Sequence, residues 1–263
     1  MVANKGLLSN KAIPADERLI LALDVPSPEE AWRLAMRLGP RVRFYKLGLE
    51  LFMAGGYFEL VAALRERGNR VFVDLKFFDV PQTVASAVRQ LAARGADFCT
   101  IHGNDAIMEA ACAVKEDLRV RRHRPHQPRS ARHGGAGLPD RHRLAGAEPR
   151  PPGAELGCDG VVSSGLEAQR LRSDLGDRLL VVVPGIRPAL NRPADDQKRT
   201  MDVEEAFRAG ADYIVVGRPI HAAADPCAAA EDIQNRIALL FGGQDAAHDR
   251  GLTTAADGGG GST

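Results

Sequence analysis

The sequence has 263 residues, with 35 lysines and arginines against 34 aspartates and glutamates, which gives a formal charge of +1. A chain of this length can form one α/β barrel or two smaller domains. Because a nearly neutral chain has no overall field that would draw it to nucleic acid or to a membrane, we expect neither as a partner. The composition is better suited to a small polar substrate.

The cysteines and the apolar segments indicate the compartment. Cys99, Cys112, Cys158 and Cys227 lie far apart and form no C-x-x-C pair, which argues against a disulfide framework and against a zinc site. Residues 1–16 carry few apolar side chains, and no stretch of about 18 apolar residues occurs, so we expect neither a signal peptide nor a membrane span. These features predict a soluble, cytoplasmic protein.

Short apolar segments of strand length alternate along the chain with longer amphipathic segments. The first pair is a strand within residues 18–24 and a helix over 28–38 that begins after Ser27. Further strands are predicted at 42–47, 71–75, 98–101, 160–163, 179–183 and 213–216, and further helices at 57–67, 83–94, 106–115, 166–171 and 203–209.

Strands that are apolar on both faces and alternate with helices indicate a parallel sheet. The visible units predict a (β/α)8 TIM barrel, an α/β fold, in which the fifth β-α unit is degraded or irregular. We expect this barrel to form a single domain over residues 1–242. The small, polar residues 243–263 predict a disordered tail.

Residues 118–155 differ from the rest of the chain. They are rich in arginine, proline and histidine (His123, His126, His133 and His142) and poor in large apolar residues, which predicts that they cannot form a buried strand. A nucleic-acid loop would need aromatic residues, and a metal site would need a regular ligand spacing; both are missing. A natural disordered insertion is one explanation of this composition. We favour a stretch translated out of frame, because the regular pattern resumes abruptly at Glu155.

Polar residues follow most of the predicted strands. In an eight-stranded barrel the carboxyl ends of the strands converge on one mouth, whatever their separation in sequence. A stabilising ion pair could explain one or two such charges, but not charges at most of the strand ends. The sequence therefore predicts a functional site formed by Asp24, Lys46, Asp74, Lys76, His102, Arg187 and Arg218.

Asp74 and Lys76 are two residues apart, so on a strand they point to the same side, and Asp79 follows just beyond the strand. Together with Lys46 they give two ammonium groups and two carboxylates, and each charge holds its neighbours ionised. A protonated lysine aimed at one point can donate a proton to a carbanion. A fixed carboxylate near a substrate carboxylate disfavours that group until it leaves.

Two turns late in the sequence are typical of phosphate binding. Gly185 precedes Arg187, and Gly217 precedes Arg218, after the last two predicted strands. A glycine lets the backbone approach an anion, and an arginine can grip it. This is the usual location for a phosphate in such a barrel.

The motifs occur together in a fixed order. They are Leu23-Asp24-Val25, Lys46-Leu47-Gly48, the run Asp74-Leu-Lys76-x-x-Asp79-x-Pro81-x-Thr83, Ile101-His102, Pro184-Gly185-Ile186-Arg187, Asp196-Gln197 and Val216-Gly217-Arg218. In order and spacing they resemble the orotidine 5′-phosphate decarboxylase family, over residues 19–115 and 156–226. The resemblance implies decarboxylation of orotidine 5′-phosphate to UMP, in de novo pyrimidine synthesis, with no metal or organic cofactor.

The resemblance also implies a role for each matching residue. Lys76 is expected to donate a proton to C6 of the pyrimidine, Asp74 to face the departing carboxylate, and Lys46 to complete the charged network and touch the ribose. Asp24 is expected to contact a ribose hydroxyl. The 5′-phosphate is expected to be bound by Arg187, Gln197, Gly217 and Arg218. His102 is also expected to bind the substrate. Asp79 and Thr83 are expected to reach the partner's active site, which implies a homodimer with shared sites.

One part of the family pattern is missing. The family's fifth strand normally supplies a Val-Thr-Val-Leu-Thr-Ser-like segment whose hydroxyl groups help to bind the pyrimidine, and residues 118–157 offer only the isolated Ser130. We therefore expect this chain to be poorly folded or less active than its relatives.

Two alternatives stay open. One is a related Mg2+-dependent sugar-phosphate decarboxylase or aldolase, in which the second strand ends on an acidic metal ligand where this chain has Lys46. The other is a non-catalytic binder of a nucleotide phosphate.

Overall fold

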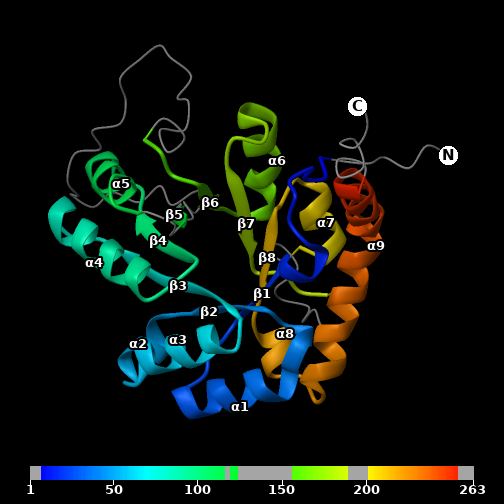
Figure 1. The fold of residues 1–263 in the computed structure, drawn as a ribbon, viewed down its shortest axis with the longest axis horizontal. Helices are drawn as coiled ribbons and strands as arrows, with labels where there is room; N and C mark the ends of the chain where they lie inside the picture. The colour runs from blue at the N-terminus through cyan, green and yellow to red at the C-terminus, as the bar shows by residue number, and fades with distance from the viewer. Residues whose placement is uncertain (1–6, 116–118, 124–155, 189–200, 254–263) are drawn as a thin grey trace, which may run out of the picture.

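The computed structural model describes residues 7–115, 119–123, 156–188 and 201–253, and for 119–123 and 243–253 it describes the backbone alone. In this part of the chain, eight parallel strands pair in sequence order and close into a barrel, with β1 hydrogen-bonded to β8. Helices cover the outside of the barrel (Figure 1). The expected TIM-barrel fold is therefore confirmed.

Most elements lie where the sequence places them. The strands are β1 (Leu19–Ala22), β2 (Phe44–Leu47), β3 (Arg70–Phe77), β4 (Phe98–His102), β5 (Arg119–His123), β6 (Gly160–Val162), β7 (Leu180–Pro184) and β8 (Tyr213–Val216). The helices are α1 (Pro28–Leu38), α2 (Leu49–Met53), α3 (Tyr57–Glu66), α4 (Pro81–Ala93), α5 (Asp105–Cys112), α6 (Gly165–Leu175), α7 (Val203–Arg208), α8 (Arg218–His221) and α9 (Pro226–Thr253).

Helix α1 shows how local sequence sets these bounds. The side chain of Ser27 accepts a hydrogen bond from the backbone N–H of Glu30 (3.2 Å), and Pro28 occupies the first helical position. The helix ends at Gly39, whose φ of 56° lies in a region that favours glycine. These signals give the same bounds that the apolar periodicity predicts.

The fifth strand corrects one expectation. Residues 118–155 were predicted to be unable to form a buried strand, but Arg119–His123 form β5, which pairs in parallel with β4 and with β6. A parallel ladder requires backbone N–H and C=O groups, and this short segment contains no proline, since the first proline of the region is Pro125. The barrel can therefore close despite the unusual composition. Residues 124–155, with His126, His133, His142 and Ser130, lie outside the described residues.

The last helix, α9, was not among the predicted elements. The barrel domain was expected to end at residue 242, but α9 continues to Thr253, so a disordered tail from 243 is wrong for residues 243–253. Gly242 and Gly243 lie within this helix, where a glycine costs only about 1 kcal/mol relative to alanine. Residues 254–263 lie outside the described residues. Within the described residues, no helix combines the length and apolarity needed to span a membrane.

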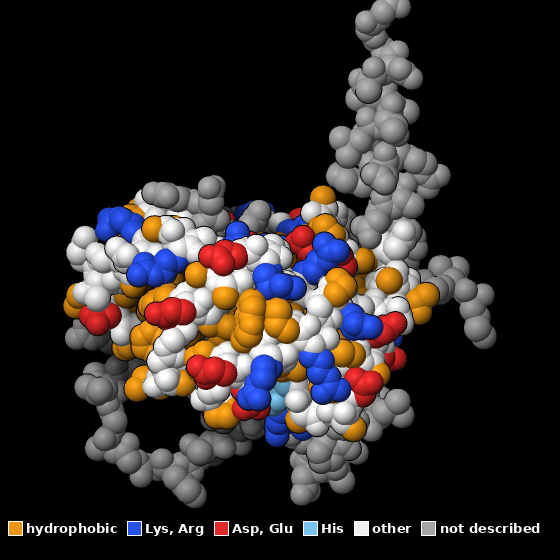
Figure 2. All heavy atoms as spheres, turned by 60° about the horizontal axis from the view of Figure 1, so that its bottom comes forward, with side chains coloured by type: hydrophobic (Ala, Val, Ile, Leu, Met, Phe, Trp, Pro, Cys, Tyr) orange, Lys and Arg blue, Asp and Glu red, His pale blue; other side chains and the backbone are white. Residues whose placement is uncertain are grey.

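The charges are distributed evenly on the face shown in Figure 2. Lysine and arginine side chains lie among aspartate and glutamate side chains there, with hydrophobic side chains between them. This mixture agrees with the formal charge of +1. The cysteines form no disulfide among the described residues, although the sulfur atoms of Cys112 and Cys158 lie 3.4 Å apart.

The interior of the barrel is packed with side chains. An inner cluster is formed by Ile20, Ala22, Phe44, Phe72, Phe98, Val162, Leu180, Val182, Tyr213 and Val215. Its aromatic rings meet edge to face, as in Phe44 and Phe98, whose centroids lie 4.9 Å apart. A second, larger cluster fills the space between the strands and the helices. The barrel interior is therefore a packed core and not a channel, and it can hold the residues at the barrel mouth in fixed positions.

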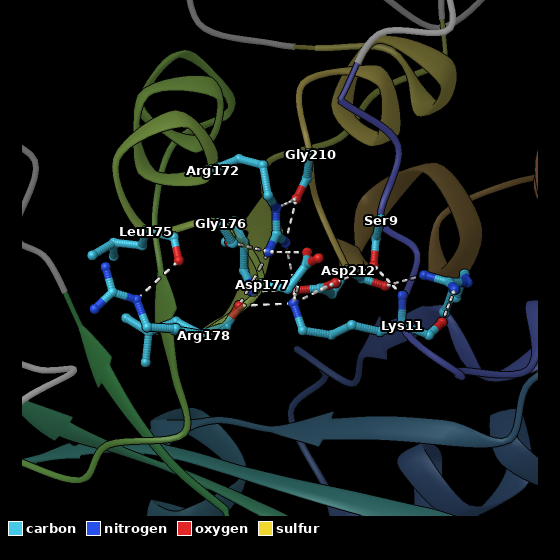
Figure 3. Close-up of polar contacts among 12 residues, drawn as sticks. Ser9, Lys11, Arg172, Leu175, Gly176, Asp177, Arg178, Gly210 and Asp212 are labelled. Atoms are coloured by element: carbon cyan, nitrogen blue, oxygen red, sulfur yellow. Dashed lines mark hydrogen bonds and ion pairs between the residues drawn. The ribbon is translucent and has the colours of Figure 1, made fainter.

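A buried charge network lies at the amino end of β8, between the N-terminal segment and α6 (Figure 3). Asp212, which precedes β8 and is fully buried, accepts hydrogen bonds from Ser9, from Lys11 (3.2 Å), from Arg172 of α6 (2.8 Å) and from the backbone N–H of Val181 (2.7 Å). The network ties the N-terminal segment and α6 to two strands. Its position at the amino ends of the strands indicates a role in stability.

We predict that Asp212→Asn lowers the free energy of unfolding by about 3–5 kcal/mol, because it leaves the buried Arg172 and the half-buried Lys11 without their shared carboxylate. The matched control is Asp177→Asn. Asp177 contacts the same two cations (3.8 and 3.3 Å), but its side chain is 47% exposed, so its removal should cost less than about 1 kcal/mol. Urea unfolding of both variants checks this, and equal losses would contradict the assignment.

Candidate active site

The alternation of side chains along each strand places the polar residues at the barrel mouth. Positions two apart on a strand point to the same side. Ala22 of the inner cluster is followed by Asp24, Phe44 by Lys46, Phe72 by Asp74, and Phe98 by Thr100. The inward-facing positions therefore change from apolar to polar toward the carboxyl ends of these four neighbouring strands.

Asp74 is the centre of this polar group. Its Oδ1 lies 2.9 Å from Lys76 Nζ and accepts a hydrogen bond from the hydroxyl of Thr100 (2.8 Å). Its Oδ2 lies 3.4 Å from Lys46 Nζ, and Lys46 Nζ also donates to Asp24 Oδ1 (3.3 Å). The side chains of Lys46 and Asp74 are 12% and 13% exposed. The structure thus brings together Asp24, Lys46, Asp74 and Lys76, as the sequence predicted.

Asp74 is held ionised by its neighbours. Burial alone would raise the pKa of its carboxyl, but the ammonium groups of Lys46 and Lys76 and the hydrogen bonds from Lys76 and Thr100 outweigh burial and hold the pKa below its ordinary value. A fixed negative charge therefore lies at the barrel mouth between two positive charges.

The backbone at Lys76 is strained. Its φ of 51° makes it the one residue other than glycine with a positive φ among the described residues. The pairing of β3 with β4 also shifts register between Val73 and Phe77. Both features aim the side chain away from the path of a regular strand, and such strain clusters at functional sites.

A cavity of about 390 Å3 opens beside these residues. Asp24, Lys46, Asp74 and Lys76 line one part of it, and the turns after β7 and β8 line another, with Gly185, Arg187, Gly217 and Arg218. Gly185 has a φ of 76°, which favours glycine, and a Cβ atom built there would meet no heavy atom within 4 Å. The backbone of this turn is open to a ligand, and two arginines stand beside it.

Other predicted site residues lie outside this cavity. The ring of His102 packs against Phe78 (4.5 Å between centroids), and its Nδ1 is buried with no hydrogen-bond partner among the described residues. Asp79 and Thr83 are exposed, and Asp79 accepts a hydrogen bond from the N–H of Val80. None of these three lines the cavity of its own chain. Gln197 lies outside the described residues.

Sequence reasoning missed Thr100. It is fully buried, and its hydroxyl connects β4 to both Asp74 and Lys76. A threonine within an apolar strand is a common residue, so its type gives no signal. The available signal was the alternation from Phe98, which puts Thr100 on the inward face beside Asp74.

Together, the fold and the cavity define a (β/α)8 barrel with a charged lysine and carboxylate array and a phosphate-type turn pair at its mouth. The model of the orotidine 5′-phosphate decarboxylase / HUMPS family matches residues 17–133 and 140–233. The match includes most of residues 118–155, where the motifs alone indicated no resemblance. The chain therefore belongs to this family.

Individual relatives agree with the family match. A protein of Methylococcus capsulatus named orotidine 5′-phosphate decarboxylase is 54% identical over 239 residues, which are 90% of this chain and 98% of the relative. One of the same name from Xanthomonas oryzae is 46% identical over 249 residues, which are 88% of this chain and 96% of the relative.

Solved structures of the same name share the fold. The orotidine 5′-phosphate decarboxylase of Lactobacillus acidophilus superposes with a TM-score of 0.64 at 29% identity and covers 84% of this chain and 99% of its own. That of Pyrococcus horikoshii gives a TM-score of 0.61 at 25% identity, with 83% and 98% covered.

Proposed function

We propose that this chain decarboxylates orotidine 5′-phosphate to UMP without a cofactor, as a step of pyrimidine biosynthesis. The observation that carries the proposal is that Lys46, Asp74 and Lys76 form one contacting array on the same cavity as the two glycine and arginine turns. Such a cavity can hold a phosphate at one end and a reacting ring at the other.

The array supplies the chemistry. Loss of CO2 leaves an electron pair on C6 of the pyrimidine, and the Lys76 ammonium, held 2.9 Å from Asp74, donates the proton that replaces the carboxylate. Asp74, kept ionised, stands where the substrate carboxylate binds and disfavours that group until it leaves. Lys46 shares its charge between Asp24 and Asp74, so both carboxylates stay fixed. Asp24 is then placed to accept a hydrogen bond from a ribose hydroxyl.

The turns after β7 and β8 supply binding energy away from the reacting atoms. Arg187 and Arg218, with the backbone at Gly185 and Gly217, are suited to the dianionic 5′-phosphate. Gln197 is a further candidate for a substrate contact. Energy from a remote phosphate can be used to hold the pyrimidine against the charged array.

The central prediction concerns Lys76→Ala. Removing the proton donor should lower kcat for orotidine 5′-phosphate by at least about 10³-fold, as measured by the loss of substrate absorbance and by CO2 release. The matched control is Lys115→Ala, which removes a lysine paired with Asp159 at a similar distance (3.0 Å) but outside the cavity, and should leave kcat unchanged.

Two further results of this assay would contradict the proposal. Loss of turnover on adding EDTA would favour a Mg2+-dependent sugar-phosphate reaction. We expect no such loss, because two ammonium groups already compensate the negative charge of Asp74. Binding of UMP without CO2 release would favour a non-catalytic binder of a nucleotide phosphate.

We further propose a homodimer in which the subunits share their active sites. Asp79 and Thr83 are exposed and lie outside the cavity of their own chain, so they are available to a second one. Large apolar side chains are exposed beside Asp79 in the sequence and on α2. Phe78 and Val80, which flank Asp79, are 70% and 61% exposed, and Leu49 and Met53 of α2 are 61% and 75% exposed. Exposed side chains of this kind favour a protein interface.

Mixing inactive variants tests the shared site. When Lys76→Ala and Asp79→Asn subunits are unfolded and refolded together, half of the dimers are mixed, and each mixed dimer keeps one intact site, so activity should return to about a quarter of wild type. Lys76→Ala mixed with Asp74→Asn is the control, because both residues belong to one barrel and no site is intact. Equal recovery in both mixtures, or none in either, would contradict the shared site.

We also propose that the fifth β-α unit is degraded in function, although β5 is present. Residues 118–155 offer only Ser130 in place of the hydroxyl residues expected to bind the pyrimidine. In the same assay, kcat should be lower than that of the Methylococcus capsulatus relative, and replacing residues 118–155 with the relative's segment should raise it. Full turnover by the chain as it stands would contradict this.

A further inference from the structure

Thr100 contacts both partners of the reactive pair. It is fully buried, and its Oγ1 donates a hydrogen bond to Asp74 Oδ1 (2.8 Å) and accepts one from the backbone N–H of Lys76 (3.0 Å). A hydroxyl has one proton and two lone pairs, and here the proton goes to the carboxylate while a lone pair faces the N–H. One side chain therefore fixes the position of the carboxylate and of the lysine backbone.

The second of these bonds lies where the strand ladder is irregular. The register of β3 against β4 shifts between Val73 and Phe77, and Lys76 has a φ of 51°. A strained backbone of this kind persists only where surrounding contacts hold it, and a buried N–H without an acceptor is costly. Thr100 Oγ1 supplies the acceptor for the backbone N–H of Lys76 at this irregular position of β3.

The groups that face Asp74 come from four elements. They are Lys46 on β2, which also contacts Asp24, Lys76 on β3, Thr100 on β4, and Tyr57 on α3, whose hydroxyl donates to Leu47 O. Burial and then the charge of Asp74 raise the pKa of the Tyr57 phenol, so Tyr57 stays neutral. Among these groups Thr100 is the one neutral donor to the carboxylate.

We propose that Thr100 is a positioning residue for the decarboxylation: its hydroxyl holds the Asp74 carboxylate and the Lys76 backbone in the arrangement that aims the Lys76 ammonium. Thr100 is not a proton donor to the substrate, because its proton is engaged with Asp74. The inference rests on the proposed function and adds to it a residue of β4.

Valine and serine at position 100 separate this role from simple packing. Valine keeps the branched shape and loses the hydroxyl, whereas serine keeps the hydroxyl and loses a methyl group. A role in packing alone would therefore favour Thr100→Val, and a role of the hydroxyl would favour Thr100→Ser. Tyr45→Phe on β2 is a control for removing a buried hydroxyl, since Tyr45 Oη has no hydrogen-bond partner among the described residues.

The experiment measures kcat and KM for orotidine 5′-phosphate against pH in these variants. Thr100→Val should lower kcat about 10- to 100-fold, which corresponds to losing a hydrogen bond to a charged group, with little change in KM. Thr100→Ser should keep kcat within a few-fold of wild type, and Tyr45→Phe should leave it unchanged.

The pH dependence gives a second readout. Because Thr100 stabilises the charged form of Asp74, its loss raises the pKa of that carboxyl, and the fall of kcat on the acid side should begin at a higher pH in Thr100→Val than in wild type. If the valine variant fails to fold by circular dichroism, Thr100→Ala compared with Thr100→Ser gives the same test.

Several outcomes would overturn the positioning role. They are wild-type kcat with an unchanged acid limb in Thr100→Val, or a loss in Thr100→Ser as large as in Thr100→Val. A wild-type chain that releases no CO2 would instead contradict the proposed function, and with it any role of Thr100 in that reaction. The two failures are thus distinguishable.

Discussion

The candidate site depends on one buried carboxylate that stays charged. Asp74 is nearly enclosed, and a lone carboxylate in that position would take up a proton. The ammonium groups of Lys46 on β2 and Lys76 on β3 and the hydroxyl of Thr100 on β4 prevent this protonation. Their spacing in turn depends on the barrel, whose aromatic interior packs beneath the array. The Asp212 network lies at the amino end of β8, where it has a role in the stability of the barrel.

Much of this arrangement could be predicted from the sequence, because a parallel barrel converts a simple pattern into a site. Apolar segments of strand length define the strands, and polar residues just after them must meet at the mouth. This reasoning placed Asp24, Lys46, Asp74 and Lys76 correctly, and it placed Arg187 and Arg218 on the same cavity. The same logic placed His102 in the site, but the structure packs its ring against Phe78 outside the cavity. The alternation of side chains along a strand predicts which side of the strand a residue faces, but it does not predict what that residue contacts at the end of the strand.

The features that sequence reasoning missed depend on backbone geometry and on contacts across strands. The positive φ of Lys76 and the register shift beside it leave no mark in residue type, and Thr100 matters only because β4 lies next to β3. Arg119–His123 were judged by composition, yet strand pairing is made by the backbone, which these residues can supply. Helix α9 continues past Gly242 and Gly243 to Thr253, since a glycine within a helix costs only about 1 kcal/mol relative to alanine.

The ionisation of Asp74 between the two ammonium groups can be measured directly. The side-chain carboxyl carbon of Asp74 is followed by 13C NMR as the pH is lowered, with Asp74→Asn used to assign its resonance. A titration midpoint below the ordinary aspartate pKa of about 3.8 is the result expected when Lys46, Lys76 and Thr100 stabilise the carboxylate. A midpoint above that value would show that burial outweighs Lys46, Lys76 and Thr100, and would contradict the account of the site.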